Sequence, residues 1–143
     1  REKNLDPAEV QQAVAAEVTK LDGIALAVTS SDILSGKLPE TQVTRAVLNN
    51  HHPRRSGDIY VVFDPHCFIN DFDGLEVACT HGSPWRYDTF VPVIFAGSKL
   101  KPLDVYRRVH TVDVAATLAA WLGAVPPSGA AGNVLQEVVG QKN

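Results

Sequence analysis

Two hydrophobic patterns alternate along the N-terminal part of the chain. Asp6 and Pro7 are typical of a helix start, with Glu9 placed to complete a capping box. The apolar positions that follow are spaced by four and three residues, so they predict a helix with one apolar stripe that ends at Gly23. Residues 24–29 are nearly all apolar, which indicates a short strand buried on both faces.

The same order of elements then repeats. Residues 30–35 predict a polar turn or single helical turn closed by Gly36. Pro39 begins a second helix, which the Asn and Pro residues of positions 49–53 end. The apolar run over residues 58–63 predicts a second strand, central in a sheet. Helix, strand, helix, strand is an α/β or α+β order.

Hydrophobic periodicity fades over residues 64–79, which we interpret as a surface excursion with a short strand at 75–78. Residues 91–96 are apolar again and predict a third strand, in which Pro92 is tolerated near the start. The excursion leads into residues 79–97, a loop that ends in this predicted strand and in which the chemistry of the chain is to be sought.

The last helix is predicted over residues 111–122, with Thr111 as its cap, Asp113 in its first turn and Gly123 at its end. It has hardly any polar face, so we expect it to be buried among other elements or against a neighbour. Residues 134–138 add a last packed turn.

Composition restricts the class of protein. The chain has 143 residues, of which 45% are hydrophobic, enough for the core of one domain covering residues 1–143. Its net charge is −3 and it has no basic stripe, which argues against binding to duplex nucleic acid. No run of eighteen apolar residues and no signal peptide are present, so no membrane span is expected. We predict an α/β fold with a mixed, mostly parallel sheet and flanking helices.

Residues 79–97 contain the best candidate for chemistry. His81 lies between Thr80 and Gly82, in a polar loop followed by the third predicted strand. Small neighbours allow a ligand or metal to approach closely, and loops anchored on strands often carry sites. A catalytic zinc needs about three protein ligands, however, and this loop supplies one. On the residues alone, His81 is either a metal ligand or a loop histidine bonded to backbone.

Other candidates have ordinary structural alternatives. His51, His52 and His66 could be combined with Asp58 or Asp64 into a zinc site, but adjacent histidines after a helix are more often solvated. Residues 71–74 begin like a calcium loop but lack the remaining oxygen ligands, so a surface turn is favoured.

The remaining candidates stay open at this point. Cys67 and Cys79 could pair or remain thiols. Ser83 has no assignable base, and His110 could cap a helix or bond backbone. Trp85 and Tyr87 could flank a substrate entrance, although packing is more usual for such aromatic residues.

Four segments in a fixed order resemble one family. They are RRSGDIYVVF, THGSPWRYDTFVPVIFAG, HTVDVAATLAAWLG and PPSGAAGNVLQEV. Together they resemble the C-terminal end of the alkaline phosphatase superfamily, in its bacterial branch of monomeric alkaline phosphatases and type I phosphodiesterases or nucleotide pyrophosphatases. The resemblance covers residues 56–138, and the helix, strand and helix before them also fit.

The resemblance implies hydrolysis of phosphate esters with two zinc ions and a phosphorylated Thr or Ser nucleophile. His81 occupies the position of the family's zinc-binding histidine, and Thr80 and Gly82 would form the backbone frame that orients its ring. In such enzymes, paired metals stabilise the attacking oxygen and the charge on the transferred group. The family's cellular location would be periplasmic or secreted.

The family's nucleophile and its other metal ligands have no counterpart in this chain. We therefore expect a C-terminal fragment, about the last third of a larger metallohydrolase, with no catalytic residue and no tight zinc binding of its own. Apolar surface left without its packing partners would favour self-association. The alternative is a non-catalytic folding or association module, in which His81 is structural and no metal binds.

Overall fold

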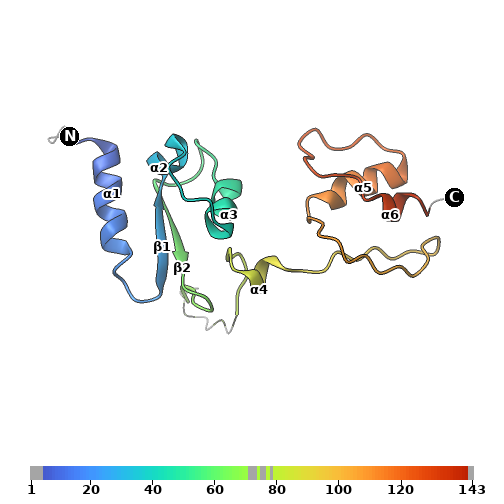
Figure 1. Ribbon diagram of the computed structural model, residues 1–143, viewed down its shortest axis with the longest axis horizontal. Helices are drawn as coiled ribbons and strands as arrows, with labels where there is room; N and C mark the ends of the chain where they lie inside the picture. The colour runs from blue at the N-terminus through green and yellow to red at the C-terminus, as the bar shows by residue number, and fades with distance from the viewer. Residues whose placement is uncertain (1–4, 71–73, 75–76, 78, 142–143) are drawn as a thin grey trace. The chain divides into compact units, whose positions relative to one another are not determined.

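The structure, a computed structural model, describes residues 5–70, 74, 77 and 79–141 (Figure 1). The elements are α1 (Pro7–Val18), β1 (Ile24–Thr29), α2 (Ser30–Ser35), α3 (Gln42–Asn50), β2 (Ile59–Phe63), α4 (Arg86–Thr89), α5 (Asp113–Leu122) and α6 (Gln136–Val139). Contacts within the chain divide it into two compact units, one up to Phe90 and the other from Val91. The single domain over residues 1–143 stays a prediction, and each unit is described by itself.

The sheet of the first unit differs from the predicted one. Strands β1 and β2 pair antiparallel, with Val28 opposite Tyr60 and Thr29 opposite Ile59, and the register shifts between Ile24 and Leu26. The expected mostly parallel sheet is therefore not found among the described residues. The expectation came from the apolar character of both strands, but burial on two faces makes a strand apolar whichever way its neighbour runs.

Both faces of this sheet are covered near the end of β1. Val28 of β1, Val62 of β2 and Val47 of α3 form the buried core, each at most 2% exposed. The next residue, Thr29, points to the opposite face because side chains alternate along a strand, and there it accepts a hydrogen bond from Gln12 of α1. Figure 1 shows α1 running alongside β1. The prediction that both strands are buried on two faces therefore holds only near the end of β1, because the rest of β1 and most of β2 are half-buried. Strand β2, predicted to be central in a sheet, has β1 as its single partner among the described residues.

Helix α1 begins as predicted and ends early. The carboxylate of Asp6 accepts from the amide of Ala8 at 2.9 Å, and Pro7 is the first helical residue. The helix stops at Val18, and the chain turns through the following residues to Gly23, which has a φ of 85°. Gly23 therefore ends the connection to β1 rather than the helix.

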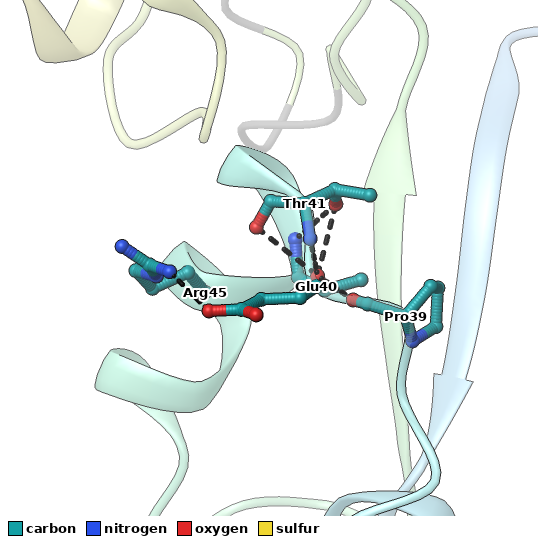
Figure 2. A network of polar contacts seen from close by, with 5 residues as sticks. Pro39, Glu40, Thr41 and Arg45 are labelled. Carbon is teal, nitrogen blue, oxygen red and sulfur yellow. Dashed lines mark hydrogen bonds and ion pairs between the residues drawn. The ribbon is translucent and has the colours of Figure 1, made fainter.

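Helix α3 begins at a capping box that lies after the predicted start at Pro39 (Figure 2). The hydroxyl of Thr41 accepts from the amide of Thr44 at 3.1 Å, and the hydroxyl of Thr44 accepts from the amide of Thr41 at 3.0 Å. These bonds satisfy two backbone donors at the helix start. An ion pair between Arg45 and Glu40, 2.6 Å apart, spans the same turn. The helix therefore starts where its free amides are capped.

Helix α5 in the second unit is also capped differently from the prediction. The cap position is Val112, and Thr111 makes no capping bond. Instead, the carboxylate of Asp113 accepts from the amides of His110 and Asn133, each at 2.8 Å. These two amides lower the pKa of Asp113, in that order of importance. The same carboxylate thereby joins the start of α5 to the loop before α6.

A buried hydroxyl completes the second unit. Thr117 of α5 is fully buried and donates to the carbonyl of Asp113 at 2.7 Å, while it accepts from the amide of Leu135 at 3.0 Å. Leu135 is itself buried and precedes α6, so the predicted last packed turn is confirmed. Several apolar side chains of this helix and its flanks remain exposed, namely Val112, Leu118, Leu122 and Val125.

The predicted third strand is not observed. Residues 91–96 form no strand, and Val91 and Ile94 are 52% and 81% exposed. A strand requires a hydrogen-bonded neighbour, and the described part of this unit offers none. The predicted strand at 75–78 and the calcium-like residues 71–74 lie largely outside the described residues. None of the described helices has the length and apolar character needed to cross a membrane.

Candidate functional site

The candidate residue His81 lies in the loop that leads into α4. His81, Thr80 and Gly82 are all exposed. Gly82 has a φ of 105°, a backbone conformation that other residues rarely adopt, although a side chain there would meet no other atoms. The chain therefore turns sharply just after His81, and the turn depends on glycine for conformational reasons.

A carboxylate from α4 holds this turn. Asp88 accepts a hydrogen bond from the backbone amide of Ser83 at 2.6 Å. This bond is the main reason that the pKa of Asp88 lies below its usual value. Partial burial opposes the shift, and the backbone of Gly82 and the charge of His81 add smaller lowering effects. The electrostatic environment therefore keeps Asp88 ionised beside the His81 loop.

The indole of Trp85 fixes the start of α4 to the sheet. Its Nε1 donates to the carbonyl of Phe63, the last residue of β2, at 2.8 Å. The ring also packs against the core formed by Val28, Val47 and Val62. Trp85 thus has the packing role that the sequence favoured, and it attaches the loop to a rigid strand.

Tyr87 makes a second attachment. Its hydroxyl accepts from the backbone amide of His66 at 3.0 Å, and the two rings stack with centroids 4.5 Å apart and planes inclined by 17°. His66 has a φ of 67°, so this turn is locally strained. Trp85 and Tyr87 therefore connect the start of α4 to the last residue of β2 and to the turn that follows β2, respectively.

The described residues do not by themselves fit a zinc ion. No group of three or more His, Cys, Asp or Glu side chains among them is arranged to hold a metal. A zinc site needs about three protein donors, and His81 would supply one. Any complete site would need donors from outside the described residues.

The other candidate ligands are not brought together. His52 accepts a hydrogen bond from the amide of Arg54 at 3.2 Å, and His66 stacks on Tyr87. His51 lies at the end of α3, where its Nε2 is buried without a hydrogen-bond partner. The structure therefore gives no support to a zinc site built from these histidines.

Three further candidates have simple outcomes. Cys67 and Cys79 are exposed free thiols, so they do not pair. His110 contributes its backbone amide to Asp113. Ser83 contributes its amide to Asp88, and this contact does not make Ser83 a nucleophile. Asp88 is the residue that the sequence analysis missed, because its position five residues after Ser83 matches no recognised capping spacing.

Comparison with known proteins places the chain in context. No family model matches it. It is 32% identical over 93% of its length to a protein of Myroides odoratus named calcium-transporting ATPase. It is 27% identical over 97% of its length to alkaline phosphatase PhoV of Synechococcus elongatus. Each match covers 24% of the relative, so the chain spans about a quarter of the length of these proteins.

A solved structure extends the comparison to the fold. The crystal structure of wild type alkaline phosphatase PafA superposes with a TM-score of 0.73 at 27% identity. The match covers 94% of this chain and 25% of that protein. The agreement of sequence and fold over nearly the whole chain confirms the resemblance inferred from its motifs: the chain is similar to a C-terminal portion of proteins of the alkaline phosphatase superfamily.

Proposed function

We propose that this chain is the C-terminal part of a zinc-dependent phosphate ester hydrolase, of alkaline phosphatase or phosphodiesterase type, and that His81 is one of its metal ligands. The observation that supports this most is the position of His81. It is an exposed imidazole in a glycine turn, and that turn is attached through Asp88 and Trp85 to the end of a buried strand. Such an arrangement presents a donor from a rigid support.

The role of the chain in this proposal is to supply and orient one donor. Thr80 and Gly82 frame the imidazole, and the nucleophile, a Thr or Ser that becomes phosphorylated, and the remaining donors come from elsewhere in a longer protein. The chain alone is then inactive towards phosphate esters and binds zinc weakly. The family resemblance supports a periplasmic or secreted location for the longer protein.

Replacement of His81 in the longer protein tests the proposal. His81→Ala should lower zinc content and the rate of aryl phosphate hydrolysis by more than the roughly tenfold to hundredfold loss that removal of an outer partner of a metal ligand causes. His52→Ala is the control, since that histidine is also exposed but belongs to a different turn, the one that follows α3. If His81→Ala retains full zinc content and rate, His81 is not a ligand.

A second candidate is a non-catalytic folding or association module. It is supported by the exposed apolar side chains of α5, of which Leu122 is 73% exposed and Leu118 is 44% exposed. This function predicts that Leu122→Ser weakens association while His81→Ala changes neither association nor metal content. The hydrolase proposal predicts instead that His81→Ala lowers metal content more than Leu122→Ser does.

A further inference from the structure

Asp88 reaches farther back along the chain than a helix-capping carboxylate normally does. It is the third residue of α4, the position from which an acidic side chain usually bonds the amide of the cap residue, here Trp85. Its carboxylate instead accepts from Ser83, two residues before that cap. With only four residues, α4 has little helix of its own to stabilise. The bond therefore acts mainly on the turn that precedes the helix.

The glycine in this turn explains why such a bond is needed. Gly82 separates His81 from Ser83 and has a φ of 105°. A glycine has access to many more backbone conformations than other residues. A glycine next to a metal-binding residue therefore lets that residue adopt several orientations unless the flanking backbone is held. The hydrogen bond from Ser83 to Asp88 fixes the backbone on one side of Gly82.

Asp88 is itself held by the fold. Trp85 donates to Phe63 at 2.8 Å and packs on the core, and Tyr87 stacks on His66. Trp85 and Tyr87 flank Arg86 in the sequence, so their contacts fix the first turn of α4. The connection thus runs from β2 through Trp85 and α4 to Asp88, and from there to the turn that carries His81.

We propose that Asp88 is a positioning residue for His81. By accepting the amide of Ser83, its carboxylate holds the turn at Gly82 in one conformation and so limits the directions in which the imidazole points. The consequence for metal binding rests on the proposed function, whereas the effect on the order of the His81 loop does not.

Two replacements of Asp88 separate the acceptor from the charge. Asp88→Ala removes the acceptor, and the loss of a hydrogen bond to an ionised group should speed hydrogen exchange at the Ser83 amide about tenfold. The order parameter of the His81 amide should fall below about 0.6, the range of flexible backbone. Asp88→Asn keeps a carbonyl acceptor without the charge and should restore most of both properties.

Controls make this experiment decisive in the 143-residue chain. Asp22→Ala, which removes another exposed carboxylate of the same unit, should leave the loop unchanged. Amides of Val28 and Val62 should stay equally protected in every variant, because they lie in the core. The inference is overturned if Asp88→Ala leaves Ser83 exchange and His81 order unaltered, if Asp88→Asn behaves like Asp88→Ala, or if core protection falls together with that of Ser83.

Zinc affinity in the longer protein distinguishes this inference from the proposed function. Asp88→Ala should weaken zinc binding by about tenfold to a hundredfold, less than His81→Ala, and Asp88→Asn should recover most of the loss. If His81→Ala retains zinc, the proposed function fails while the result on loop order stands. If zinc depends on His81 but not on Asp88, positioning by Asp88 is refuted and the proposed function stands.

Discussion

Thr117 allows the stability of the second unit to be tested with two changes, one that removes the hydroxyl and one that removes the methyl group. Its hydroxyl is fully buried, donates to the carbonyl of Asp113 and accepts from the amide of Leu135. Thr117→Val keeps the volume but leaves the Leu135 amide without an acceptor in a buried position. An unsatisfied buried donor costs about 1–3 kcal/mol.

Thr117→Ser provides the matched comparison. It keeps the hydroxyl and removes one buried methyl group, which should cost about 1 kcal/mol. We therefore expect Thr117→Val to lower the free energy of unfolding of this unit about as much as, or up to about 2 kcal/mol more than, Thr117→Ser. The two variants differ most clearly at one amide: Leu135 should lose its protection from exchange in the valine variant and keep most of it in the serine variant.

Native-state hydrogen exchange measured by NMR gives both quantities. The amides of α5 report the stability of the unit, and the amide of Leu135 reports the bond itself. If the valine variant protects Leu135 as well as the wild-type chain does, the hydroxyl of Thr117 is not its acceptor in solution. A serine variant less stable than the valine variant would show that packing of the methyl group outweighs the hydrogen bonds.

Three further predictions follow from other contacts. Gly132→Ala should destabilise the second unit, because a Cβ there would collide with the backbone carbonyl of Val112, and thermal unfolding at wild-type temperature would contradict this. The hydrogen bond from Arg107 lowers the pKa of Glu137 to about 2. The contribution of this pair to the free energy of unfolding should therefore be present above the usual carboxyl pKa and lost as pH falls through about 2. NMR titration of Glu137 in Arg107→Gln should show the pKa returning upwards, and an unchanged pKa would exclude the pair. Exposed apolar side chains such as Leu122 should cause the chain to self-associate, and sedimentation as a monomer at all concentrations would refute this.

The sequence predicted those elements whose signals are local. The start of α1 depends on Asp6 and Pro7, which act on the next few residues, and both were found in their expected roles. Gly36 and Gly123 close α2 and α5 with left-handed backbone, at φ values of 68° and 70°. Interactions within one turn of helix can be recognised from residue type and spacing alone.

Elements that depend on distant partners were predicted less well. Residues 91–96 have the composition of a strand, but a strand forms only beside another strand, and composition does not name one. The direction of β1 relative to β2 was predicted wrongly for the same reason, because composition does not show which way a neighbouring strand runs. The cap of α5 was assigned to Thr111, whereas the structure uses Asp113, whose second partner is Asn133, twenty residues away.

The candidate site depends both on local signals and on distant partners. His81 was proposed as a metal ligand from its neighbours and from the order of four motifs, which are local features of the sequence, and this role stays a prediction. Asp88 was missed because its role depends on the turn at Gly82 bringing the amide of Ser83 towards α4. The sequence left the roles of Trp85 and Tyr87 open, and their partners at Phe63 and His66 could be identified only in the structure.

A crystal structure of the longer protein, grown with zinc and measured across the zinc absorption edge, would test the metal assignment most directly. We predict an anomalous peak about 2.0–2.1 Å from a ring nitrogen of His81, the usual length of a zinc–nitrogen bond, with the other donors supplied by residues outside this chain. A fully occupied metal centre in which His81 is not a ligand would contradict the proposal.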